Sequence, residues 1–147
     1  MDPFVSSAHR TRVLVVDDDP SSRLLVWTVL KRYGFSVALA NNAADAERRM
    51  ADEQFELLVT DNHMPREDGV SFVRRLRTSN ETSLQNHRNI PVVMISGQSG
   101  KTELSEAANA GVHAFVEKPF LPSALGKLVK MVAAGDHKQF AHYSTLN

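Results

Sequence analysis

The stretch RVLVVDDDPSSRLLVWTVLKRYG, residues 12–34, decides the fold of this chain. It begins with an apolar run, passes through three aspartates, and continues with apolar residues at three- and four-residue spacing, which is typical of an amphipathic helix. Asp19 can cap that helix, Pro20 suits its first position, and Gly34 can close it in a left-handed turn. The stretch therefore predicts a strand followed by a helix over residues 20–33.

The same pattern recurs four more times along the chain. Further apolar runs predict strands that end at Ala40, Thr60, Ile95 and Glu117. Helical spacing follows over residues 43–52, 69–78, 100–110 and 121–134. Near-continuous apolar strands that alternate with helices predict a parallel sheet covered on both faces and joined by right-handed crossovers. The expected fold class is a doubly wound α/β sandwich.

The chain divides into one domain and two flanking segments. We expect an N-terminal extension over residues 1–10, the domain over 11–134 and a C-terminal tail over 135–147, because Gly135 is a stop signal and no periodicity follows it. Residues 78–89 are polar and long for a helix-to-strand connection, so they predict a surface loop or an extension of the preceding helix.

Composition excludes several classes of protein. Seventeen basic residues balance seventeen acidic ones, so no field of one sign is available to attract nucleic acid. The absence of cysteine excludes disulfides and thiolate metal sites. The apolar runs are far shorter than the roughly 20 residues of a membrane helix, and the N-terminus does not read as a signal peptide. We expect a soluble, cytoplasmic protein without membrane insertion.

Chemically capable residues follow four of the five predicted strands. The first strand runs into Asp17 and Asp18, the third into Asp61, the fourth into Ser96 and the fifth into Lys118. Ligands of open parallel sheets bind outside the carboxyl ends of the strands, so these residues are expected to share one site. Clustered carboxylates repel one another unless a cation intervenes, and oxygen ligands favour Mg²⁺, or Mn²⁺ as a substitute.

These residue types suit phosphoryl transfer. Asp61 is the candidate nucleophile. Lys118 can pair with its carboxylate and then with a phosphoryl oxygen, while Ser96 can donate its hydroxyl.

Four stretches in this order, VLVVDDDP, LLVTDNHMPREDG, VVMISG and FVEKPF, resemble the receiver domains of response regulators in two-component signal transduction. The resemblance covers about residues 11–134. It implies a flavodoxin-like (βα)5 fold with a five-stranded sheet of order 2-1-3-4-5. It also implies a signalling switch that accepts a phosphoryl group from a histidine kinase or a histidine phosphotransfer protein and catalyses its own aspartyl phosphorylation and dephosphorylation.

The resemblance assigns the metal site residue by residue. Asp17 and Asp18 match the acidic pair, with Asp18 the more direct ligand and Asp17 acting largely through water. Asp61 matches the phosphorylated aspartate, which also binds the metal. His63 is implied to contribute its backbone carbonyl to the ion.

The resemblance also assigns the switch. Ser96 matches the hydroxyl residue that moves towards the phosphoryl group, and Phe115 matches the aromatic residue that fills the vacated space. A cis peptide before Pro119 is implied to aim Lys118 into the site. The face of the fourth helix, fifth strand and fifth helix is then remodelled for an output partner that the sequence does not identify.

Further residues are candidates for tuning or docking. His63 and Gln98 are hypothesised to set the lifetime of the phosphoryl group, and Trp27 is expected to be exposed as an anchor for the phosphodonor protein. The other histidines show no metal-ligand spacing and are expected at the surface: His9, His87, His113, His137 and His142.

An alternative is a phosphohydrolase of the haloacid dehalogenase type, with Asp17 as nucleophile. It is disfavoured because no acidic strand end follows Lys118 and because Asp61 would have no role. A degenerate receiver that serves only as an interaction module is disfavoured by the intact set of site residues. The sequence leaves open whether the chain is a stand-alone response regulator or the receiver part of a hybrid histidine kinase.

Overall fold

The computed structural model describes residues 9–97, 100–136 and 139–144; Gln98 and His137 lie outside the described residues. The strands are β1 (Arg12–Val16), β2 (Ser36–Ala40), β3 (Leu57–Asp61), β4 (Val92–Ser96), β5 (Ala114–Glu117) and β6 (Ala141–Tyr143). The helices are α2 (Pro20–Arg32), α3 (Ala43–Asp52), α4 (Gly69–Thr78), α5 (Lys101–Ala110) and α6 (Pro122–Ala133), with a short 3-10 helix η1 (Gln85–His87).

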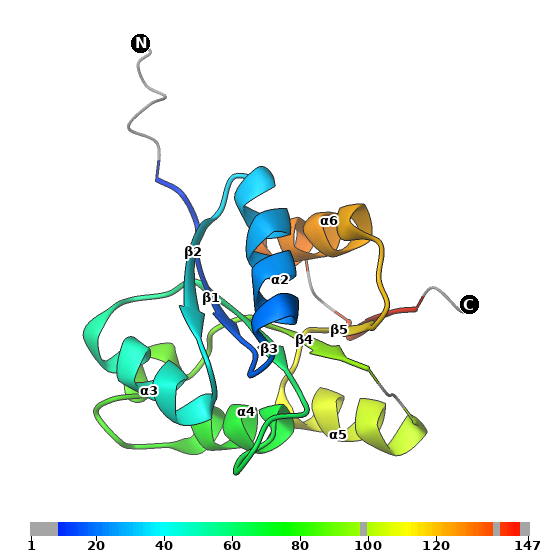
Figure 1. Ribbon diagram of the computed structural model, residues 1–147. Coiled ribbons are helices and arrows are strands. Elements are labelled where there is room, and N and C mark those ends of the chain that lie inside the picture. Colours follow the sequence, from blue (N-terminus) through cyan, green and yellow to red (C-terminus); the bar gives the residue numbers. More distant parts are fainter. Residues whose placement is uncertain (1–8, 98–99, 137–138, 145–147) are drawn as a thin grey trace.

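The strands form one parallel sheet of order β2-β1-β3-β4-β5-β6. Helices α2 and α6 cover one face of the sheet, and α3, α4 and α5 cover the other (Figure 1). The flavodoxin-like doubly wound fold is thereby confirmed, and the predicted order of the first five strands is correct. In the part of the chain that the structure describes, no helix is both long enough and apolar enough to cross a membrane.

Strand β1 shows why the apolar runs of this chain are continuous. Val13 and Val15 lie in the core beneath α2 and α6, whereas Leu14 and Val16 lie in the core on the opposite face. A strand buried on both faces needs apolar side chains at successive positions. Full burial of each contributes roughly 1.5–3 kcal/mol, so the central strands fix the sheet and thus the ends that carry the site.

The residues predicted to start and end the first helix are confirmed. The Asp19 carboxylate accepts a hydrogen bond from the Ser22 N–H at 3.0 Å, and Pro20 occupies the start of α2. Gly34 follows the helix with a φ of 91°, in the left-handed region. The cap fixes where β1 stops and α2 starts, and so positions the aspartates between them.

The connection between α4 and β4 is more than a surface loop. It contains η1, and its side chains Leu84 and His87 are buried. The His87 Nε2 accepts a hydrogen bond from the Phe55 N–H at 2.9 Å, and burial lowers the pKa of His87. The expectation that His87 lies at the surface was wrong, because the buried Phe55 N–H requires an acceptor.

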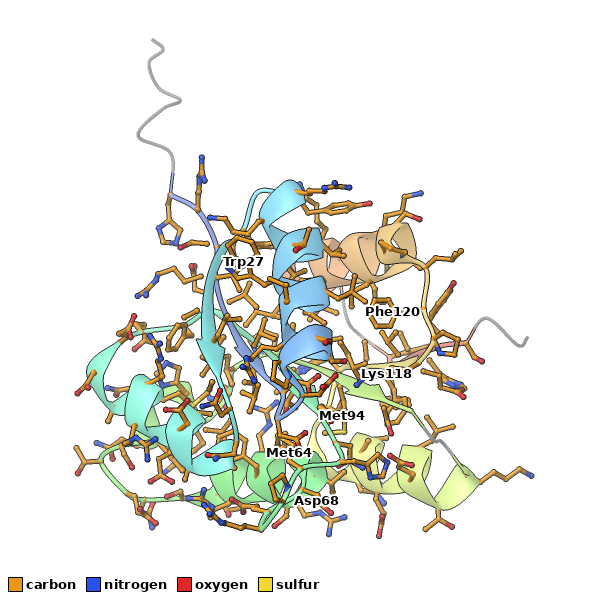
Figure 2. The ribbon with its side chains drawn as sticks, viewed as in Figure 1. Trp27, Met64, Asp68, Met94, Lys118 and Phe120 are labelled. Carbon is orange, nitrogen blue, oxygen red and sulfur yellow. The ribbon has the colours of Figure 1, made fainter. Side chains whose placement is uncertain are left out.

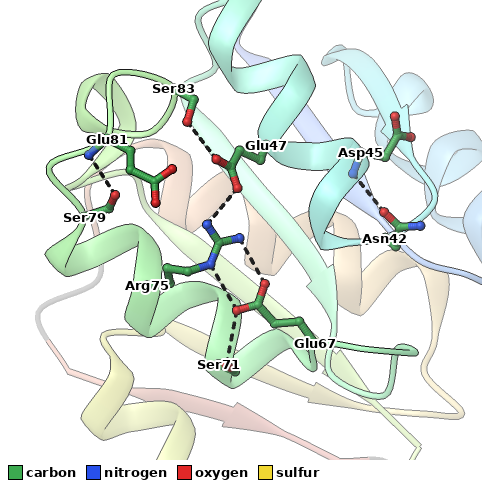
Figure 3. Close-up of polar contacts among 9 residues, drawn as sticks. All are labelled: Asn42, Asp45, Glu47, Glu67, Ser71, Arg75, Ser79, Glu81 and Ser83. Carbon is green, nitrogen blue, oxygen red and sulfur yellow. Dashed lines mark hydrogen bonds and ion pairs between the residues drawn. The ribbon is translucent and has the colours of Figure 1, made fainter.

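A polar network braces this connection against α3 and α4 (Figure 3). Arg75 of α4 donates to Glu47 of α3 at 2.7 Å and to Glu67, in the loop before α4, at 3.0 Å. Glu47 also accepts from the Ser83 hydroxyl at 2.7 Å. These contacts raise the pKa of Arg75, chiefly through Glu67, so the guanidinium stays charged. Arg75 thus links the loop between β3 and α4, through Glu67, to helix α3.

The C-terminal segment differs from the predicted tail. Residues Ala141–Tyr143 form β6, which pairs in parallel with β5, so the described part of the chain has a six-stranded sheet rather than five strands. Phe140 and Tyr143 are partly buried against the two cores. A strand of three residues is too short to show an alternating pattern, which explains why the sequence did not predict it.

Candidate functional site

The carboxyl edge of the sheet brings together the three aspartates that the sequence singled out. Asp17, Asp18 and Asp61 each offer a carboxylate oxygen, and these oxygens lie within 4.8 Å of one another. Asp17 and Asp61 are buried, with 3% and 7% of their surface exposed, whereas Asp18 is exposed. The cluster therefore opens to solvent on the side of Asp18.

Lys118 lies between two of these carboxylates. Its Nζ is 3.6 Å from Asp17 Oδ2 and 3.6 Å from Asp61 Oδ1. The peptide bond between Lys118 and Pro119 is cis, as the family resemblance implied. The Lys118 N–H donates to the Ser96 carbonyl at 2.7 Å, which ties the ends of β4 and β5 together. Figure 2 shows Lys118 at this edge, near the first turn of α2.

Hydrogen bonds hold the two chain segments that carry the cluster. Asp17 accepts a hydrogen bond from the Asp19 N–H at its Oδ1 (2.9 Å), and its carbonyl accepts from the Arg23 guanidinium (2.8 Å). Beyond Asp61, the buried Asn62 accepts at its side-chain Oδ1 from the Val70 N–H at 2.9 Å. Both chain segments that carry the cluster are therefore fixed before any ligand binds.

The electrostatics of the cluster favour a cation. The pKa of Asp61 is raised to about 6, first by burial and further by the charges of Asp17 and Asp18, while Lys118 and His63 oppose the shift. One ammonium faces three carboxylates, so the pocket keeps an excess of negative charge. An all-oxygen donor set with one open side fits a hard divalent ion such as Mg²⁺.

Ser96 makes a contact that the sequence did not predict. Its side chain is fully buried, and its hydroxyl donates to Glu103 Oε2 at 2.8 Å. The same oxygen accepts from the Asn62 Nδ2 at 2.8 Å and lies 3.4 Å from His63 Nε2. The only sequence signal for Glu103 is its place as the acidic residue in the first turn of α5. Glu103 thus joins the two loops that flank Asp61.

Phe115 is fully buried on β5, and its ring meets the ring of His142 on β6 edge-on at 6.2 Å between centroids. His142 also pairs with Glu117, one residue before Lys118. The residue predicted to act as an aromatic switch therefore lies directly beside His142 of the extra strand.

Trp27 is half-buried, which differs from the expected exposure. The Lys31 Nζ lies 5.9 Å from the centre of its ring and covers it in part. The more exposed apolar side chains of α2 are Leu24 and Leu25, at 58% and 45%. Leu25 is therefore largely outside the core, and the docking role of Trp27 stays a prediction.

Gly69 provides a test of how tightly the loop after β3 is packed. A Cβ at this position would lie 2.6 Å from the Asp61 carbonyl oxygen and 3.0 Å from the Asn62 Cα. Because these are backbone atoms, we expect Gly69→Ala to destabilise the protein by about 1–3 kcal/mol in urea unfolding. Gly97→Ala is the control, since a Cβ there meets nothing within 4 Å. Equal stability of the two variants would contradict the prediction.

The fold and the site together define a class of protein. A doubly wound sheet with an aspartate cluster, a lysine and a hydroxyl at the ends of its strands is suited to accepting a phosphoryl group on a carboxylate. Residues 13–130 match the family described as the response regulator receiver domain. The chain belongs to this family and is a phosphoacceptor receiver domain of two-component signalling.

Individual relatives agree with this assignment. The chain is 32% identical over 123 residues to the chemotaxis protein CheY1 of Helicobacter pylori, covering 82% of this chain and 95% of that protein. It is 29% identical over 117 residues to the CAI-1 autoinducer sensor kinase/phosphatase CqsS of Vibrio cholerae, covering 80% of this chain and 16% of that protein. The solved structure of the chemotaxis response regulator CheY4 of Vibrio cholerae has a TM-score of 0.75 at 26% identity, covering 84% of this chain and 99% of that one. These relatives give no support to the haloacid dehalogenase alternative.

Proposed function

We propose that Asp61 is the phosphoacceptor of this receiver domain and that its donor is a phosphohistidine on a histidine kinase or a histidine phosphotransfer protein. The observation that carries the proposal is the place of Lys118, whose ammonium is equidistant from the buried carboxylates of Asp17 and Asp61. A lysine so placed neutralises the nucleophile before transfer and can pair with a phosphoryl oxygen afterwards.

The transfer step follows from these positions. An Asp61 carboxylate oxygen attacks the phosphorus, the P–N bond of the donor breaks, and its electron pair stays on the imidazole nitrogen, which takes up a proton. With a pKa of about 6, Asp61 is largely ionised at neutral pH and is a competent nucleophile. The ammonium of Lys118 compensates charge on the incoming phosphoryl group.

We further propose that Asp17, Asp18, Asp61 and the backbone carbonyl of His63 hold Mg²⁺, with Mn²⁺ as a substitute. The support is the cluster of three carboxylates and its uncompensated charge. When bound, the ion supplies further neutralisation of the phosphoryl oxygens. The exposed His63 side chain lies beside Glu103, near the pocket, so it remains a candidate for tuning the lifetime of the phosphoryl group; Gln98 is the second.

The output surface is proposed to be the face of α5, β5 and α6, which correspond to the fourth helix, fifth strand and fifth helix of the family. Ser96 at the end of β4 and Phe115 on β5 are the proposed switch residues. Both are fully buried, so a change in the site can reach this face only by repacking. The match spans 95% of the chemotaxis protein CheY1 but only 16% of the sensor kinase CqsS. In our proposal, the phosphodonor of this chain is a histidine whether the chain is a stand-alone response regulator or the receiver part of a hybrid histidine kinase.

Mass spectrometry after treatment with a small phosphodonor tests the proposed function. We expect one phosphoryl group per chain, on the peptide that contains Asp61, and only when Mg²⁺ is present. Removal of the metal with a chelator is expected to abolish labelling, because the repulsion within the cluster is then uncompensated. Labelling of Asp17 instead, or turnover of many equivalents of donor without a labelled protein, would overturn the proposal.

A further inference from the structure

Glu103 contacts residues that border the phosphoacceptor pocket, although it is not one of the clustered aspartates. Its carboxylate comes from the first turn of α5, and its side chain is 17% exposed. One of its oxygens, Oε2, accepts hydrogen bonds from the Ser96 hydroxyl and the Asn62 amide, both at 2.8 Å. A single acidic oxygen therefore holds the end of β4 and the loop after β3 to the start of α5.

The hydroxyl of Ser96 cannot serve two anions at once. A serine hydroxyl has one O–H to donate, and here that O–H is donated to Glu103. The proposed function requires the same O–H for a phosphoryl oxygen on Asp61. Hydrogen bonds to an ionised acceptor are about twice as strong as neutral ones, so the contact with Glu103 is a substantial competitor.

We propose that Glu103 is a positioning residue that competes with the phosphoryl group for Ser96 and thereby favours the unphosphorylated state of the receiver. This inference rests on the proposed function of Asp61. The phosphoryl group carries about 1.5 to 2 negative charges, in place of the single charge of the ionised Asp61 carboxylate, and it draws the Ser96 hydroxyl away from Glu103 and repels the Glu103 carboxylate. Loss of this contact releases the first turn of α5, so Glu103 links the chemistry of the site to the helix that borders the proposed output face.

Binding of beryllofluoride, a phosphoryl mimic, in the presence of Mg²⁺ tests the inference by ¹⁹F NMR or calorimetry. We expect Glu103→Ala to bind the mimic about tenfold more tightly than the wild type, which corresponds to about 1.4 kcal/mol. Glu103→Gln, which keeps a neutral acceptor, is expected to lie between the two. Glu106→Ala is the matched control, because Glu106 is an exposed glutamate on the same helix. We expect it to bind as the wild type does.

A second background separates competition for the hydroxyl from a general effect of charge. In Ser96→Ala protein there is no hydroxyl to compete for, so adding Glu103→Ala is expected to leave the affinity for beryllofluoride unchanged within about twofold. Mg²⁺ affinity without the mimic is expected to be equal in the wild type and Glu103→Ala.

Three results would overturn the inference. Equal beryllofluoride affinity of the wild type and Glu103→Ala would remove the proposed competition while leaving the proposed function intact. The same tightening with and without the Ser96 hydroxyl would show a charge effect that does not pass through Ser96. Absence of Mg²⁺-dependent binding by the wild type itself would overturn the proposed function, and the inference with it.

Discussion

Asp61→Asn is expected to abolish phosphoryl incorporation and, at the same time, to stabilise the metal-free protein at neutral pH. The first effect follows because an amide oxygen is a poor nucleophile. The second follows because Asp61 is buried beside Asp17 and Asp18, and its ionised form is disfavoured in the fold. Loss of labelling with a gain in stability would be a signature that damage to the fold could not produce.

The sign of the pH dependence follows from the raised pKa of Asp61. Its pKa is about 6 in the folded protein, against 3.8 as the reference value for the unfolded chain. Well below pH 3.8, Asp61 is protonated in both the folded and the unfolded chain, and it then does not lower the free energy of unfolding. Between these pH values the unfolded chain loses the proton first, so the free energy of unfolding falls as pH rises. Above the pKa of the folded protein, the ionised Asp61 lowers the free energy of unfolding by its full amount, about 1–3 kcal/mol.

Urea unfolding of the wild type and Asp61→Asn, both with a chelator present, measures this cost. The difference in stability is expected to be small at pH 4 and to grow to about 1–3 kcal/mol at pH 7. Asp19→Asn is the control, because Asp19 is exposed and asparagine caps a helix as well as aspartate does. A difference for Asp61→Asn that did not change with pH would contradict the assigned pKa.

Lys118→Met is expected to lower the rate of phosphoryl incorporation by on the order of 10²–10³, the usual effect of removing one stabilising group from a charged transition state. Methionine keeps much of the side-chain length but not the ammonium that lies 3.6 Å from Asp17 and from Asp61. Because Lys118 is the largest influence that lowers the pKa of Asp61, that pKa is expected to rise further above 6.

The affinity for Mg²⁺ distinguishes loss of the ammonium from loss of the site. Removal of a positive charge from the cluster is expected to leave Mg²⁺ binding as tight as in the wild type or tighter, while labelling falls. Lys127→Met, at an exposed position of α6, is expected to behave as the wild type in both measurements. Labelling of Lys118→Met at the wild-type rate would refute the role given to this residue.

Much of the site could be predicted because each of its residues stands directly at or after the end of a buried strand. Asp17, Asp61, Ser96 and Lys118 are placed by β1, β3, β4 and β5, and the apolar runs of those strands are legible in the sequence. Parallel strands bring their carboxyl ends to one edge of the sheet, so the sequence alone predicts that these residues, although far apart along the chain, form one site.

The features that the sequence did not reveal depend on contacts between distant elements. His87 is buried because it accepts from the Phe55 N–H, 32 residues away. Glu103 reaches Ser96 and Asn62 only once α5 is packed in the fold, and its place in the first turn of α5 does not by itself indicate these partners. Strand β6 is stabilised by pairing with β5 rather than by its own three residues. In each of these three features, contacts between elements that are distant in sequence determine the local structure.

The short strand β6 has a consequence for how other proteins can approach this domain. Three residues join it to β5, whereas the inner strands β1, β3 and β4 are buried on both faces. Detaching so small a unit costs far less than global unfolding. An incoming extended peptide with more extensive pairing could therefore take its place along β5. Such an exchange would remove the His142 ring from Phe115 and separate His142 from Glu117, the residue that precedes Lys118.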